Sequence, residues 1–107
     1  MAQLPKDEAL SQGVKLERKQ IVSACIMRVE VGTNTPRGGD AGHGGRTILD
    51  IVMESDASLD VTVGDQTFHD TWRATLVFGG DAEAICIAQA LRFAADVLDR
   101  QIAVNKG

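Results

Sequence analysis

Alternation between hydrophobic and polar positions predicts four β-strands, because the side chains of a strand point in turn to its two faces. The predicted strands run from about Ile21 to Val31, Thr47 to Glu54, Leu59 to Val63 and Trp72 to Phe78. The stretch Gln66–Thr71 fits either an extension of the third strand or a bend. The pattern therefore places most of the first 80 residues in a sheet.

A predicted helix follows the strands, from Ala82 to about Val104, in a stretch that is rich in alanine and leucine and contains no glycine or proline. Asp81 is the expected N-cap, since a carboxylate accepts hydrogen bonds from the free N–H groups of a first helical turn. Strands followed by one long helix indicate an α+β domain. We expect a mainly antiparallel four-stranded sheet with the C-terminal helix packed across one face.

The alternation also predicts which side of the sheet is the core. The fourth strand directs its even-numbered side chains inward, namely Trp72, Ala74, Leu76 and Phe78. The opposite, outer face of the sheet carries a second apolar set, made of Val22, Ile26, Ile48, Val52 and Val77. Acidic residues such as Asp50 and Glu54 are expected at the solvated surface.

The predicted helix is more apolar than one sheet contact requires. On a helical wheel, the apolar residues cover about 200° or more, whereas a helix on one sheet needs about half that width. A 107-residue chain cannot easily bury both this surplus and an apolar outer sheet face. We therefore expect a homo-oligomer, with a two-fold dimer favoured. The predicted interface consists of Ile87, Ala90, Ala94 and Val97, where small residues permit close helix–helix approach.

Length and composition indicate one domain, residues 14–107, preceded by a polar arm, residues 1–13. The arm is expected either to form a short helix around Lys6–Ser11 or to stay disordered. A formal net charge of -4 argues against a nucleic-acid partner. The sequence predicts neither a membrane span nor a secretory signal. We expect a cytoplasmic protein in which Cys25 and Cys86 are free, buried thiols.

Five of the 11 glycines fall between positions 38 and 45, within a loop predicted over residues 32–46. The residues expected to meet a ligand or partner there are Arg37, Gly39, Asp40, Gly42, His43 and Arg46. The loop fits a flexible connection, a surface that recognises a protein, or an anion nest with Arg37 and Arg46 as counter-charges. A metal site is a further alternative if Asp40 and His43 meet His69 and Asp70. Otherwise, His69 and Asp70 are expected to be turn residues.

The glycine-rich loop does not match a phosphate-binding P-loop, because Arg46 stands in place of lysine and a predicted strand follows it. We identify no catalytic constellation, cofactor motif or metal-ligand spacing in the sequence. The favoured function is therefore a small cytoplasmic binding and assembly module that oligomerises through its helix and presents residues 32–46 to a partner. The alternative is an enzyme or ligand-binding protein with an anion or metal site at this loop.

Overall fold

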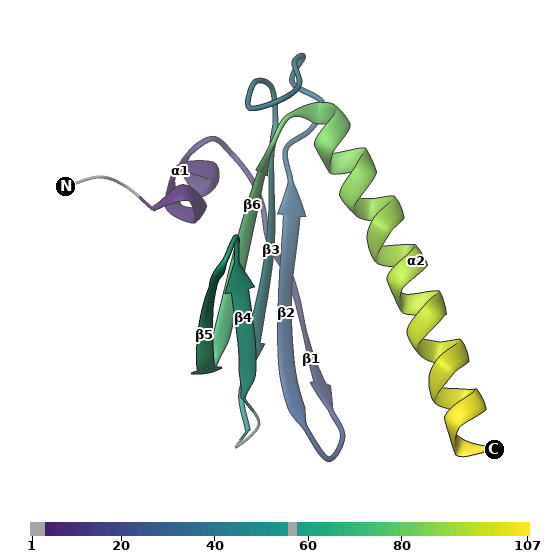
Figure 1. Cartoon of the computed structure of the whole chain (residues 1–107). Helices are drawn as coiled ribbons and strands as arrows, with labels where there is room; N and C mark the ends of the chain where they lie inside the picture. Colours follow the sequence, from purple (N-terminus) through teal and green to yellow (C-terminus); the bar gives the residue numbers. More distant parts are fainter. Residues whose placement is uncertain (1–3, 56–57) are drawn as a thin grey trace.

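A computed structural model describes residues 4–55 and 58–107 and shows an antiparallel sheet with one helix on each side (Figure 1). The main sheet has the strand order β1-β2-β3-β6, and β4 pairs with β5 in a separate two-stranded sheet. The strands are β1 (Glu17–Val22), β2 (Ile26–Thr33), β3 (Arg46–Met53), β4 (Leu59–Val63), β5 (Gln66–Thr71) and β6 (Arg73–Gly79). The helices are α1 (Pro5–Ser11) and α2 (Asp81–Lys106). The predicted α+β class, with a four-stranded antiparallel sheet and a long C-terminal helix, is confirmed.

The first predicted strand is wrong, because Ile21–Val31 contains a hairpin. β1 and β2 meet at Val22 and Ile26, and the Ser23 N–H donates to the Cys25 carbonyl at 3.0 Å. Residues paired across this three-residue turn differ by an even number of positions, so the odd-numbered residues stay on one face before and after it. The hydrophobic alternation therefore continues through the turn and conceals it.

The third predicted strand does not join the main sheet. β4 pairs only with β5, in a hairpin that stands beside β6 in Figure 1. The stretch Gln66–Thr71, for which the sequence leaves two alternatives, forms β5. Both His69 and Asp70 thus lie on a strand rather than in the turn expected for them. Trp72, expected in the core, is 61% exposed between β5 and β6.

The core lies on the face of the sheet that the alternation assigned to the outside. Ile48 is fully buried and packs with Ala9 of α1 and with Val14, and Leu16 and Val77 surround this cluster. We call this side of the sheet the arm face, since α1 and the following segment cover it. The prediction was wrong because α1 brings its own apolar residues to a face that the strands alone leave open. Residues 1–13 therefore include a docked helix, with Ala9 buried.

The segment that leads from α1 into β1 crosses β2 at Gly32. A side chain at this position would place its Cβ 2.1 Å from the backbone oxygen of Lys15. Glycine is therefore required by the close approach of two backbones where this segment crosses the sheet.

The opposite side of the sheet, which we call the apolar face, is only partly covered. Its side chains alternate with those of the arm face and include Ile21, Met27, Val29, Val31, Leu49, Ile51, Met53, Ala74, Leu76 and Phe78. α2 contacts β3 and β6 and then diverges from the strands toward its C-terminus (Figure 1). All of α2 is described, and none of its residues is buried. Neither helix in the described part of the chain combines the length and apolar character needed to cross a bilayer.

Candidate functional site

The glycine-rich loop between β2 and β3 folds onto the first turn of α2 (Figure 1). Backbone N–H groups of Gly80 and Asp81 donate to the carbonyls of Gly45 and Gly39, both at 2.8 Å. In the other direction, the Gly42 N–H donates to the Gly79 carbonyl at 2.9 Å. These bonds join residues 35–42 positions apart in the sequence. The loop is therefore an ordered part of the fold, fixed to the point where α2 begins.

The carboxylate of Asp81 binds the loop from the helix side. It accepts hydrogen bonds from the backbone N–H groups of Arg37 at 2.9 Å, Gly38 at 2.6 Å and Gly45 at 2.9 Å. The bond from Gly45 lowers the pKa of Asp81 most, and those from Arg37 and Gly38 lower it further. The loop thus forms an anion nest of the kind that the sequence suggests, and its anion is a side chain of the same protein.

The N-cap predicted for α2 is wrong. Asp81 is the first residue of the helix, and Gly80 occupies the N-cap position with a φ of 123°. The capping carboxylate comes from the loop instead, because Asp40 Oδ1 accepts the Ala82 N–H at 2.8 Å. Glu83 adds a further bond in the opposite direction by accepting the Ala41 N–H at 3.1 Å. The contacts are therefore reciprocal: carboxylates of the helix accept hydrogen bonds from the loop backbone, and a carboxylate of the loop accepts one from the helix backbone.

The two loop arginines also turn toward their own chain. Arg46 donates to the carbonyls of Gly42, Gly44 and Gly45 at 3.0–3.2 Å. Arg37 donates to the Gln12 carbonyl at 2.8 Å, which ties the loop to the end of α1. Of the six residues predicted to meet a partner, Arg37, Asp40 and Arg46 have internal partners for their side chains. His43 is exposed.

The four candidate metal ligands are not brought together. His69 lies on β5, where its Nδ1 is 3.4 Å from Asp60 Oδ1, and Asp70 accepts a hydrogen bond from Ser58 at 3.3 Å. Asp40 and His43 belong to the loop at the start of α2. Within residues 4–55 and 58–107, no three His, Cys, Asp or Glu side chains are placed to hold a metal ion.

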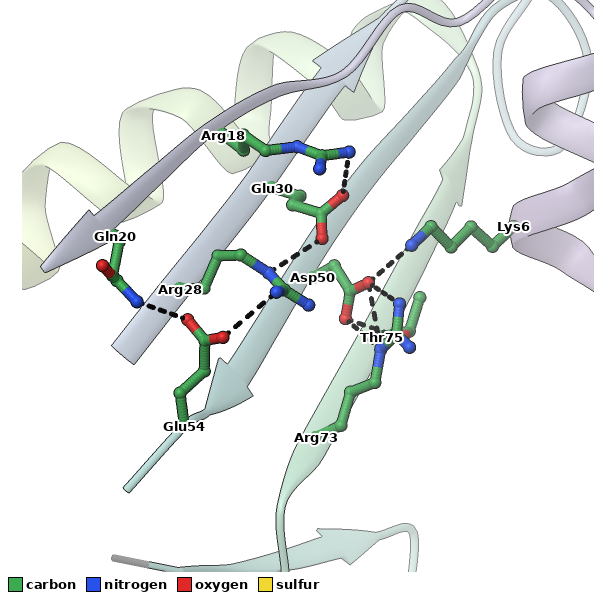
Figure 2. A network of polar contacts seen from close by, with 9 residues as sticks. All are labelled: Lys6, Arg18, Gln20, Arg28, Glu30, Asp50, Glu54, Arg73 and Thr75. Atoms are coloured by element: carbon green, nitrogen blue, oxygen red, sulfur yellow. Dashed lines mark hydrogen bonds and ion pairs between the residues drawn. The ribbon is translucent and has the colours of Figure 1, made fainter. Parts of the chain in front are cut away.

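The arm face contains a buried ionic cluster around Asp50 (Figure 2). The prediction that Asp50 lies at the solvated surface is therefore wrong. The Asp50 carboxylate, fully buried, binds Lys6 of α1 at 2.7 Å, Thr75 of β6 at 2.9 Å and Arg73 through both of its oxygens. Burial alone would raise the pKa of Asp50, but the hydrogen bonds from Arg73, Lys6 and Thr75 outweigh it and hold that pKa well below its ordinary value. The only local signal was a carboxylate between apolar residues on a strand.

A second ionic cluster continues along the same face on β1 and β2 (Figure 2). Glu30, only 4% exposed, pairs with Arg18 at 3.3 Å and with Arg28 at 3.2 Å. Arg28 also pairs with Glu54 at 3.2 Å, and Glu54 accepts a hydrogen bond from Gln20 at 3.2 Å. The cluster contains two arginines and two glutamates, so its formal charges cancel.

A pocket of about 640 Å³ opens between α1 and β6, beside the Asp50 cluster. It is lined by Leu4, Pro5, Lys6, Asp7, Leu10, Arg73, Thr75 and Val77. The two cations in this lining, Lys6 and Arg73, are already bound to Asp50. Because Asp7 adds a negative charge to the rim, the pocket offers no excess charge that would select an ionic ligand.

Many large hydrophobic side chains are exposed to solvent on α2 and on the apolar face. The large hydrophobic side chains of α2 with more than a third of their surface exposed are Ile85, Leu91, Phe93, Leu98, Ile102 and Val104. Those of the apolar face are Ile21, Val31 and Leu76. Of the predicted interface residues, Ile87 and Val97 are half-buried, and Ala90 and Ala94 are exposed. Both cysteines are free, but Cys25 is half-buried and Cys86 exposed, so the predicted full burial of these thiols is wrong for the single chain.

Comparison of the chain with protein-family models, with characterised proteins and with solved structures finds no match.

Proposed function

We propose that this protein is a small assembly module that associates with copies of itself through α2 and the apolar face of its sheet. The observation that carries this proposal is the size of the exposed surface. One chain exposes 7698 Å², whereas a compact monomer of 11.4 kDa exposes about 5,800 Å². The difference, about 1,900 Å² for each chain, exceeds the roughly 800 Å² per partner of a standard interface. Two chains together give about 3,800 Å², which lies in the range of about 2,000–5,000 Å² typical of obligate dimers.

The shape of the chain supports the same conclusion. Its radius of gyration is 15.5 Å, against about 13 Å for a compact domain of this length. α2 causes much of this extension, since its 26 residues span about 39 Å beside strands of eight residues, which span about 26 Å. A long helix with apolar side chains in water is costly for a monomer. In an assembly the same side chains become an interface.

The glycine-rich loop contributes to this proposal by fixing the direction of α2. Its bonds to Asp81, Ala82 and Glu83 hold the first turn of the helix, so they set where the far end of the helix lies. Exposed His43 remains available to a second protein, and we retain a protein partner at this loop as part of the proposal. The free cysteines support a reducing, cytoplasmic setting. The nest donates to Asp81, so these contacts give no support to an external anion as its ligand.

The mass of the protein in solution tests this proposal. We expect light scattering at micromolar concentration to give at least twice the 11.4 kDa of one chain. The Leu98→Asp variant should give the mass of one chain, because a carboxylate at an exposed apolar position opposes burial against a partner. The matched control is Gln89→Asp, which introduces the same charge on the polar side of α2 and should keep the wild-type mass. A wild-type monomer would refute self-association.

A further inference from the structure

We infer that the partner on the apolar face is the C-terminal half of α2 from a second copy, exchanged reciprocally about a two-fold axis. The two α2 helices would cross near Ala94, and each would continue onto the sheet of the other chain. This inference rests on the proposed self-association and adds its geometry. An isologous exchange of this kind closes the assembly at two chains, or at pairs of chains.

The exposure of α2 changes along its length in the way that this arrangement requires. In its first half, Ala84, Ile87 and Ala88 are half-buried where the helix meets its own sheet. In its second half, Leu98 and Ile102 continue the same helical stripe, yet each is more than half exposed. The stripe is thus apolar throughout, but the chain's own strands cover only the beginning of it. Another apolar surface must cover the rest.

The chain itself supplies a surface of the right kind and size. On the apolar face, Ile21, Val31 and Leu76 remain 39–47% exposed although α2 lies on that side. From Ala94 to Lys106, α2 extends about 18 Å, which covers much of a strand of about 26 Å. The exchanged half would therefore bury its own exposed stripe and the uncovered part of the partner's face in one contact.

The crossing point is marked by small side chains. Ala90 and Ala94 are one helical turn apart and exposed, and Val97 continues their side of the helix. Small residues let two helix axes approach to about 8 Å. The wheel places Phe93 and Val104 close to this side, and both are 70% exposed in the single chain. A helix that touches its own sheet, a partner helix and a partner sheet needs an apolar arc wider than half its circumference, and α2 has such an arc.

Charge also favours an antiparallel crossing. The first turn of α2 carries Asp81 and Glu83, and its last turn carries Lys106. A two-fold axis near the middle of the helix brings the acidic first turn of each copy toward Lys106 of the other. The helix dipoles are opposed in the same arrangement, which is their favourable orientation. A parallel pair would instead align like charges.

Disulfide trapping tests the crossing. In a Cys25→Ala, Cys86→Ala background, single cysteines are placed at Ala90, Ala94 or Val97, with Asp96→Cys on the polar side of α2 as the control. We expect mild oxidation to link two chains covalently at one or more of the three positions and not at position 96, since a disulfide needs Cα atoms about 4.4–6.8 Å apart. Light scattering before oxidation reports whether the parent is assembled.

Side-chain footprinting of the unmodified protein provides a second measurement that needs no substitution. We expect Phe93 and Leu98, both largely exposed in one chain, to be protected from hydroxyl radicals in the assembled protein and to react on dilution to monomer. A monomeric parent would refute the proposed function together with this inference. An assembly that forms no link at positions 90, 94 and 97, leaves Phe93 reactive, or contains an odd number of chains would refute the exchange alone.

Discussion

Replacing Asp50 with alanine is expected to lower the free energy of unfolding by about 3 kcal/mol, since breaking a buried ion pair typically costs 3–5 kcal/mol. The reason is that Asp50 is fully buried and holds Lys6, Arg73 and Thr75 together. Without the carboxylate, two cations face each other across the arm face. Their side chains are 18% and 34% exposed, so partial hydration keeps the cost at the lower end of that range. Urea denaturation at one fixed protein concentration measures the difference.

The matched control for Asp50 is Glu54→Ala, which removes a carboxylate from an ion pair that is accessible to water. Its cost should stay at about 1 kcal/mol or less, as for other exposed pairs. Because Lys6 belongs to α1, Asp50→Ala should also release the arm and increase proteolysis near residues 4–14. Equal losses of stability in the two variants would show that the Asp50 cluster does not anchor the arm.

Acidic pH should also reveal the contribution of ionised Asp50 to the stability of the wild-type protein. The folded state holds the pKa of Asp50 below its unfolded value of 3.8, so this carboxylate stabilises the fold fully at neutral pH. Its contribution is lost as the pH falls below about 4 and through the folded pKa. We expect the stability of the wild type to fall in that range and that of Asp50→Ala to fall less steeply. Parallel acid curves for the two proteins would contradict this assignment.

Short-range sequence patterns predicted the helices and strands in which hydrophobic residues recur at regular spacing. They did not predict contacts between segments that are distant in the sequence. The span of α2 was predicted to within about two residues because its composition and period agree. The β1–β2 turn was missed because its even register leaves the alternation unchanged. The burial of Asp50 was missed because it depends on Lys6, 44 positions away, and on how α1 docks.

In the candidate site too, features set by local sequence were predictable and features set by distant contacts were not. The glycine cluster identified the loop, since backbone freedom and close approach are local requirements. The partner of its N–H groups was not predictable locally, because Asp81 lies 36 to 44 positions from the residues that it binds. The apolar excess of α2 was predictable from the wheel. Its uneven exposure along the helix was not, since it depends on how α2 lies against β3 and β6.

Replacing Asp81 with alanine is expected to release the glycine-rich loop from α2. The Arg37, Gly38 and Gly45 N–H groups lose their acceptor, so the amides of Gly38 and Gly45 should exchange with solvent at the rate of an unstructured peptide. In the wild type, the amide shifts of both glycines should titrate with a pKa below 3.8, because the nest stabilises the ionised carboxylate. Hydrogen exchange and NMR at acidic pH measure these two effects.

Asp81→Ala should also weaken assembly, because we propose that the hydrogen bonds between the glycine-rich loop and the first turn of α2 set the direction of the helix. We expect the variant to keep its helix content but to dissociate at a higher protein concentration than the wild type. Asp99→Ala is the matched control, since it removes the same charge from the exposed polar side of the same helix. If Asp81→Ala loses loop protection but assembles as the wild type does, the loop does not orient α2. If the loop amides stay protected, Asp40, Glu83 and the backbone bonds suffice to hold it.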